Sequence, residues 1–119
     1  MTNPLLQKHC IPCEGGIPPA TDDEIRRYRS LAPGWIVRPQ LDGEKTIQTL
    51  QRTFTFKDFR AAMSFLHQVE ELAEAEGHHP DFCVHYNRVD FTLFTHAVGG
   101  LHENDFILAA KIDEMTKTR

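Results

Sequence analysis

Apolar side chains between residues 57 and 77 recur every three or four positions, a spacing that places them on one face of an α-helix. Gly77 follows this stripe and suits the left-handed conformation that ends many helices. The pattern therefore predicts a helix, with His67 outside its apolar face and in solvent. The predicted buried face consists of Phe59, Ala62, Met63, Leu66, Val69 and Ala73.

Two other segments alternate between apolar and polar side chains, which is the pattern of half-buried strands. Residues 35–56 contain Asp42-Gly43, a pair typical of tight turns, and predict a hairpin. Residues 82–96 are rich in aromatic and β-branched side chains and predict two short strands around Asn87-Arg88, or one long bent strand ending at His96. On this segment Phe91, Leu93 and Thr95 would face one side of the sheet, and Thr92, Phe94 and His96 the other.

Start and stop signals predict two further helices. Thr21 and Glu24 form a capping box before a short helix at about 22–31, and a last helix is expected at about 103–117. Asp105 falls in the first turn of the last helix, where a carboxylate suits the helix dipole. The buried face of that helix would contain Phe106, Ala109 and Ala110, with Ile112 nearer its edge.

The predicted order is helix, strand, strand, helix, strand, strand, helix, which is typical of an α+β domain with helices packed on one face of an antiparallel sheet. The other face of the sheet would carry aromatic residues or mediate self-association. Residues 1–20 are expected to form an irregular arm because prolines and glycines interrupt them. Residues 21–119 are then a single domain.

Length and charge narrow the possible functions. The 119 residues fit one domain with a real core, and a formal net charge of −4 makes a broad basic surface for nucleic acid unexpected. We see no apolar run long enough to cross a bilayer, and the N-terminus does not read as a secretory signal. We therefore expect a cytoplasmic protein with neither a membrane nor a nucleic-acid partner.

The three cysteines, Cys10, Cys13 and Cys83, are an odd number, which argues against a disulfide framework. Cys10 and Cys13 form a C-x-x-C pair, to which zinc would need two more ligands, with His9 and Cys83 as candidates. A redox motif would open a helix after a strand, whereas this pair lies in a segment rich in Pro and Gly. We therefore favour a cysteine pair without a metal or redox role.

Two adjacent histidines, His78 and His79, follow the predicted end of the central helix and precede Pro80. The proline disfavours helical geometry at His79, while Gly77 lets the chain reverse before His78. Both rings could then point into one cleft. Glu74 lies in the last helical turn, where the helix dipole opposes a carboxylate, and it could orient a histidine instead.

His96 could join this pair if its strand lies beside the segment that follows Pro80. The spacing leaves three interpretations open for the three imidazoles: a structural role alone, metal-free acid–base catalysis, or a three-histidine metal site. For His9, His67 and His102 we expect surface or structural roles.

The spacing around these histidines resembles that of the pterin-4a-carbinolamine dehydratases, also called 4a-hydroxytetrahydrobiopterin dehydratases. The neighbouring segments "YNRVDFTLFTH" and "GGLHENDFILAAKID" agree as well, so the resemblance covers nearly the whole chain. The family pattern is filled without a gap by Glu74, His78-His79-Pro80, Tyr86, His96 and Asp105.

This resemblance implies an antiparallel four-stranded sheet with three helices on one face. It also implies a reaction in which 4a-hydroxytetrahydropterin loses water to give quinonoid dihydropterin, recycling the pterin used by aromatic amino acid hydroxylases. No metal or organic cofactor is implied. Members form homodimers or homotetramers, and an aromatic amino acid hydroxylase is a possible partner.

The same resemblance assigns roles to the motif residues. His78 and His96 would transfer protons, and His79 would bind and orient the pterin. Glu74 would tune His78, and Asp105 would support the site from the last helix.

Other residues take roles from the resemblance too. The backbone around Phe94-Thr95 could hydrogen-bond the pterin ring. Phe82 would supply an aromatic wall where many members have a tryptophan. His102 stands where Ser or Thr is usual before the last helix, so we expect a weaker helix cap there.

Two alternatives compete with the enzyme. Some members bind a transcription factor's dimerisation helix or assist Rubisco assembly, and the assembly factors usually have a degraded histidine motif. The complete motif here favours the enzyme. A zinc protein with three histidine ligands would instead contain metal at a stoichiometric level.

Overall fold

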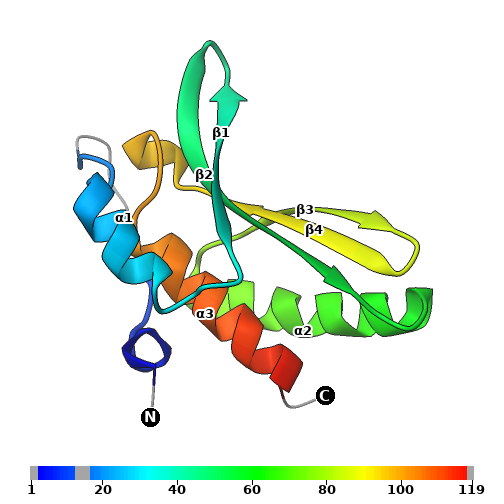
Figure 1. Ribbon diagram of the computed structural model, residues 1–119. Coiled ribbons are helices and arrows are strands. Elements are labelled where there is room, and N and C mark those ends of the chain that lie inside the picture. Colours follow the sequence, from blue (N-terminus) through cyan, green and yellow to red (C-terminus); the bar gives the residue numbers. More distant parts are fainter. Residues whose placement is uncertain (1–2, 13–16, 118–119) are drawn as a thin grey trace.

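The computed structural model describes residues 3–12 and 17–117, which form one antiparallel sheet with helices packed against it (Figure 1). The strand order in the sheet is β1-β2-β4-β3. The predicted α+β class, with a four-stranded antiparallel sheet and helices on one face, is confirmed. The elements are η1 (Pro4–Gln7), α1 (Asp22–Arg29), β1 (Ile36–Asp42), β2 (Lys45–Thr55), α2 (Phe59–Glu76), β3 (Asp81–His85), β4 (Arg88–Leu93), η2 (His96–Val98) and α3 (Glu103–Lys117).

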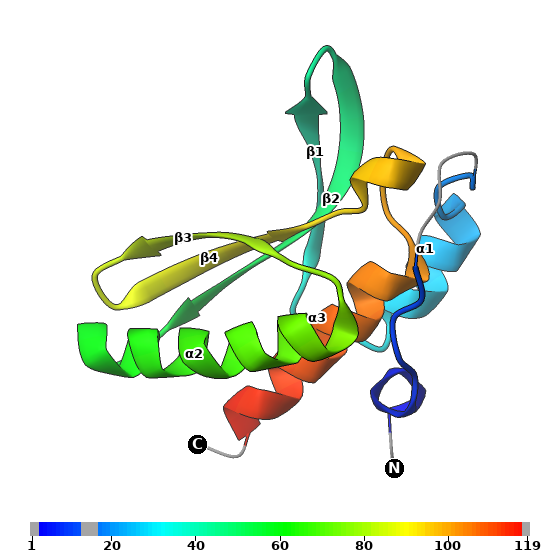
Figure 2. The same ribbon diagram turned by 180° about the vertical axis from the view of Figure 1, so that it is seen from behind.

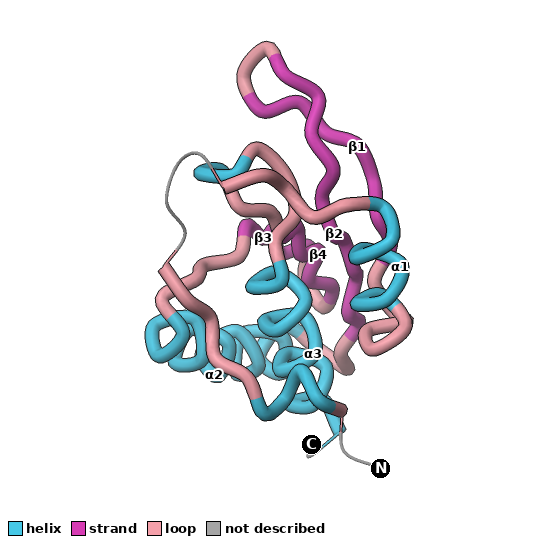
Figure 3. Tube along the Cα trace, turned by 90° about the vertical axis from the view of Figure 1, so that its left-hand side faces the viewer, coloured by secondary structure: helices cyan, strands magenta, loops and turns pink. Residues whose placement is uncertain are grey.

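The β1–β2 hairpin turns at Asp42-Gly43 as predicted, with Gly43 at a φ of +66°. It projects past the body of the sheet, and η2 lies beside it (Figures 2 and 3). The segment 82–96 forms two strands, but β4 ends at Leu93, so His96 begins η2 instead of ending a strand. The cause is a loop closed by Gly99 at a φ of +73°, whose ends are joined by the Thr95–Gly100 bridge.

The two faces of the sheet differ in polarity. Phe54 and Phe91 point toward the helices, where they pack against Phe65 of α2. The opposite face presents paired polar side chains, such as Gln51 beside Thr92. The expectation of aromatic residues on that face was therefore wrong, because strand alternation turns the aromatic side chains of both central strands inward.

Helix α2 covers the sheet with Ala62, Leu66, Val69 and Ala73, as the apolar stripe predicted. Phe59 is half exposed, however, because the buried face is rotated toward Phe65. Gly77 ends the helix in the left-handed conformation with φ at +66°. The predicted end signal is thus confirmed, and the rotation of the face is a tertiary effect.

Helix α3 lies at the centre of the helical layer, in contact with η1, α1 and α2. Its residues 104–110 are all buried, as is Ile112, which was expected near the edge. A helix surrounded by other elements has no single apolar face, and this explains the error.

The N-terminal arm is not irregular throughout, because Pro4–Gln7 forms η1 and Leu5 is buried in the core. Asn3 caps this turn and also donates to the Leu31 carbonyl at 2.6 Å. The division into an arm and a domain at residue 20 stays a prediction. In the described part of the chain, no helix is both long and apolar enough to cross a bilayer.

Candidate active site

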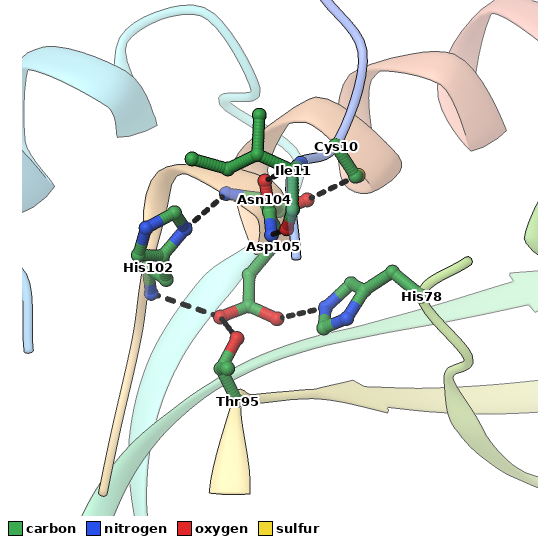
Figure 4. Close-up of polar contacts among 7 residues, drawn as sticks. All are labelled: Cys10, Ile11, His78, Thr95, His102, Asn104 and Asp105. Carbon is green, nitrogen blue, oxygen red and sulfur yellow. Dashed lines mark hydrogen bonds and ion pairs between the residues drawn. The ribbon is translucent and has the colours of Figure 1, made fainter. Parts of the chain in front are cut away.

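His78 enters the site from the sharp turn at the end of α2. Its Nε2 atom donates to Oδ1 of Asp105 at 2.6 Å (Figure 4). The His78 side chain is 14% exposed and that of Asp105 is completely buried. A charge-assisted hydrogen bond this short fixes both the orientation of the imidazole and the nitrogen that carries its proton.

Asp105 collects three donors from three parts of the chain. Oδ2 accepts from Thr95 Oγ1 and from the His102 backbone N–H, both at 3.0 Å, which leaves Oδ1 for His78 (Figure 4). His102 is the N-cap of α3 and Asp105 is the third residue of that helix, so this bond is the side-chain contact of a capping box. The same carboxylate therefore starts α3 and orients His78.

His102 does not weaken the helix cap as expected. Its Nδ1 atom accepts from the Asn104 backbone N–H at 3.0 Å, as a Ser or Thr oxygen would. The sequence-based expectation failed because an imidazole nitrogen is also a hydrogen-bond acceptor.

The adjacent histidines point in different directions. His79 Nε2 lies 2.6 Å from Oε2 of Glu74, and both side chains are largely exposed. Glu74 was expected to tune His78 but contacts His79 instead. Successive side chains of an extended chain alternate in direction, so the turn sends His78 toward α3 and His79 back along α2.

His79 and Phe82 line an apolar groove of about 430 Å³ between α2 and β3. Phe82 is about half exposed, so its ring is accessible from solvent. The remaining groove residues are Met63, Leu66, His67, Val69, Glu70, Ala73, Glu74, Pro80 and Val84.

His96 has a different carboxylate partner. Its Nδ1 atom lies 2.6 Å from Oδ2 of Asp42 at the tip of the β1–β2 hairpin, and its side chain is 83% exposed. Among the described residues, no hydrogen bond or ion pair joins His96 to His78 or His79. The link between His96 and His78 is indirect, because the neighbouring Thr95 donates to Asp105.

Other motif residues lie around these pairs. Phe94 is half-buried and Thr95 is buried. Tyr86 is exposed in the turn between β3 and β4, with an unusual positive φ of +53°. The contact of Asp42 with His96 was not predicted, because the sequence indicated only the role of Asp42 in a turn.

The structure also places Cys10, Cys83 and the candidate zinc ligand His9. His9 contacts Glu76, Cys10 donates to the Asn104 carbonyl at 3.6 Å, and Cys83 is exposed. Cys13 lies outside the described residues. Over residues 3–12 and 17–117, no three His, Cys, Asp or Glu side chains are grouped to hold a metal ion.

The fold and site define an α+β protein in which each of the motif histidines His78, His79 and His96 is paired with a carboxylate. The chain belongs to the pterin 4 alpha carbinolamine dehydratase family, whose model matches residues 18–115.

Individual relatives agree with this assignment. A protein of Rubrobacter xylanophilus named "Putative pterin-4-alpha-carbinolamine dehydratase" is 42% identical over 111 residues, or 93% of this chain and 97% of the relative. A crystal structure of a transcriptional coactivator/pterin dehydratase from Brucella melitensis superposes with a TM-score of 0.69 at 35% identity, covering 82% of this chain and 97% of that one.

A pterin dehydratase-like protein, described as a RuBisCO assembly factor in the alpha-carboxysome, shares the fold. It has a TM-score of 0.52 and 24% identity, covering 66% of this chain and 87% of that one.

Proposed function

We propose that this protein catalyses the dehydration of 4a-hydroxytetrahydropterin, such as 4a-hydroxytetrahydrobiopterin, to quinonoid dihydropterin. Family membership supports the pterin substrate. The observation that carries the chemistry is the 2.6 Å bond between His78 Nε2 and the buried Asp105 carboxylate. It prepares one imidazole for proton transfer in a fixed orientation.

The reaction needs an acid and a base but no nucleophile. Loss of water breaks the bond between C4a and its hydroxyl oxygen, and the departing oxygen takes up a proton. The lone pair of the adjacent ring nitrogen forms a double bond to C4a, and that nitrogen then loses its own proton. Histidine side chains suit both transfers because their unperturbed pKa lies near neutrality.

We assign proton transfer to His78 and His96. His78 donates from Nε2 to Asp105, so its Nδ1 atom, which has no partner among the described residues, is the nitrogen that can exchange a proton with the substrate. His96 contacts Asp42 through Nδ1, which leaves Nε2 for the same purpose. The two rings therefore exchange protons with the substrate through different nitrogens, because Asp105 contacts Nε2 of His78 whereas Asp42 contacts Nδ1 of His96.

The other site residues bind the pterin in this proposal. His79, supported by Glu74, orients the ring, and Phe82, which lines the apolar groove, contacts its flat face. The backbone at Phe94-Thr95 hydrogen-bonds the polar edge of the ring. Thr95 suits this role because its side chain is already held by Asp105.

The setting of the reaction also belongs to the proposal. We infer a cytoplasmic homodimer or homotetramer that needs no metal or organic cofactor and recycles the pterin of an aromatic amino acid hydroxylase. Family membership supports these inferences. Sedimentation of purified protein measures the assembly state, and elemental analysis measures any bound metal.

Stopped-flow absorbance with 4a-hydroxytetrahydrobiopterin tests the assignment. We expect the wild-type protein to accelerate dehydration in chelator-treated buffer, and the His78→Ala, His96→Ala double variant to be slower by at least about a hundredfold. A folded double variant as fast as the wild type would refute these catalytic roles. A wild-type protein no faster than buffer would refute the enzyme and favour a binding role on the same fold.

A further inference from the structure

The N-terminal arm crosses the junction between the end of α2 and the start of α3. The Cys10 backbone N–H donates to Glu76 Oε1 at 2.7 Å. The neighbouring Ile11 makes two bonds to the Asn104 side chain: its N–H donates to Oδ1 at 3.1 Å, and its carbonyl accepts from Nδ2 at 2.7 Å (Figure 4). Residues 9–11, called here the bridging segment, therefore bind both helices.

Glu76 is a buried carboxylate in a place where a helix does not favour one. It is the last residue of α2, where the helix dipole opposes negative charge, yet its side chain is only 5% exposed. Besides the Cys10 N–H, it accepts from Lys111 Nζ at 2.8 Å and from His9 Nδ1 at 3.0 Å. Because Lys111 belongs to α3, this carboxylate joins three segments.

These hydrogen bonds decide the charge of Glu76. Burial alone would raise the pKa of its carboxyl, but the bonds from Lys111, Cys10 and His9 outweigh it and lower the pKa to about 2. The carboxylate is therefore ionised throughout the neutral range. It accepts from all three donors under the conditions in which the site works.

Glu76 and Asn104, the two residues that bind the bridging segment, adjoin the hydrogen-bonded pair of His78 and Asp105. Glu76 precedes His78 by two residues, with only the turn at Gly77 between them, and Asn104 directly precedes Asp105. Asn104 is 3% exposed, so its bonds to Ile11 are shielded from water. Any shift between the end of α2 and the start of α3 changes the distance between His78 and Asp105.

We infer that Glu76 and Asn104 are positioning residues which, held by the bridging segment, set the hydrogen bond between His78 and Asp105. The kinetic part of this inference rests on the proposed function. The bridging segment precedes residues 18–115, which the family model matches, so the His78–Asp105 bond would be supported from outside the matched region. Misplacing catalytic groups by about 1 Å can cost about a hundredfold in rate, so a looser junction should lower kcat.

Two variants loosen the junction without touching His78 or Asp105. Asn104→Leu keeps a similar volume but removes both bonds to Ile11. Glu76→Gln keeps the shape and removes the charge that holds Lys111. The matched control is Glu103→Gln, which makes the same change in charge one residue before Asn104. It breaks only the ion pair with Lys8, which lies outside the bridging segment.

Three readouts separate arm release, site geometry and catalysis. Cys10 labelling by a thiol reagent, in a Cys13→Ser, Cys83→Ser background, reports release of the arm. The Nε2 proton of His78, observed by NMR of ¹⁵N-labelled protein, reports the bond to Asp105 without any substrate. Stopped-flow dehydration gives kcat and KM.

We expect both variants to label Cys10 at least about tenfold faster and to lose the His78 Nε2 proton signal. They should lower kcat about tenfold while KM changes by less than about twofold, because the variants misplace a proton-transfer group and leave the pterin contacts intact. Glu103→Gln should match the wild type in every readout.

A folded variant that keeps the His78 signal and the wild-type kcat overturns the inference, whether or not Cys10 labels faster. If either variant fails to fold, Cys10→Pro removes the N–H bond to Glu76, together with the contact of the thiol with the Asn104 carbonyl. This variant is judged by the His78 signal and kcat, because it has no Cys10 thiol to label. If the wild-type protein does not dehydrate the pterin, the proposed function fails. The labelling and NMR results then still decide whether the bridging segment sets the His78–Asp105 bond.

Discussion

Asp105→Asn is the sharpest test of how the site holds His78, because it changes one atom of a fully buried side chain. The carboxylate accepts from Thr95 and His102 on Oδ2 and from His78 on Oδ1. An asparagine has only one oxygen. If that oxygen keeps Thr95 and His102, the amide NH₂ faces His78 Nε2, and the imidazole must then carry its proton on Nδ1.

The size of the effect follows from this change of tautomer. His78 would present a protonated Nδ1 to the substrate, and its lone pair would point at the protein. Because a positioned acid or base contributes about 10² to 10⁴ in rate, we expect kcat to fall at least about a hundredfold. The unfolding free energy should fall by only about 1–2 kcal/mol, because Thr95 and His102 keep an acceptor and the amide NH₂ can donate to His78 Nε2 in place of the lost bond. Asp105→Ala should cost at least about 3 kcal/mol, because it leaves three donors without an acceptor.

Stopped-flow dehydration gives kcat, and urea unfolding followed by far-UV circular dichroism gives the unfolding free energy. The control is Asp113→Asn, the same change eight residues later on α3, about 12 Å along its axis. Asp113 accepts from Trp35 Nε1 at 2.8 Å and from Arg52 at 3.0 Å. The control should lose stability and keep the wild-type kcat. A stable Asp105→Asn protein with kcat within about threefold of the wild type would show that catalysis does not depend on the bond between Asp105 and His78.

Three further predictions concern other parts of the molecule. Asp42→Asn should lower kcat several-fold through His96 but change the unfolding free energy by less than about 1 kcal/mol, since the His96 side chain is largely exposed. Equal kcat for Asp42→Asn and the wild type would contradict this. In the folded protein the pKa of the Glu76 carboxyl is about 2, below its ordinary value of 4.5. Ionised Glu76 therefore adds about 3 kcal/mol to the unfolding free energy above pH 4.5, and this contribution is lost as the pH falls toward 2. Acid unfolding of Glu76→Gln should therefore show a flatter loss of stability between pH 4.5 and 2 than the wild type, and an equally steep loss would count against the pairing. Burial raises the pKa of the Cys10 thiol from 9.0 to about 12, so mass spectrometry at pH 8 should find Cys83 labelled far sooner than Cys10; comparable rates would show that Cys10 is not shielded.

Local patterns predicted those parts of the fold whose cause is local. The turn at Asp42-Gly43 and the end of α2 at Gly77 depend on backbone conformations that few residues other than glycine adopt easily. The sequence did not predict the burial of Ile112 or the exposure of Phe59. Those depend on how helices pack in three dimensions, which periodicity along one helix does not report.

In the site, too, local features could be predicted and long-range contacts could not. The stiff corner at His78-His79 could be predicted, because Gly77 and Pro80 restrict the backbone on either side. The partner of each histidine could not, because Asp105 lies 27 residues away from His78 along the chain. The alternation of side chains along an extended segment was the available signal that the two rings would point apart.

The most direct test of the proposed dehydratase activity is the rate at which wild-type protein, treated with chelator, dehydrates 4a-hydroxytetrahydrobiopterin near neutral pH. We expect a rate well above that of buffer and unchanged by added metal, and a His78→Ala protein that loses most of the acceleration. A wild-type rate equal to that of buffer, with the protein folded, would rule this activity out.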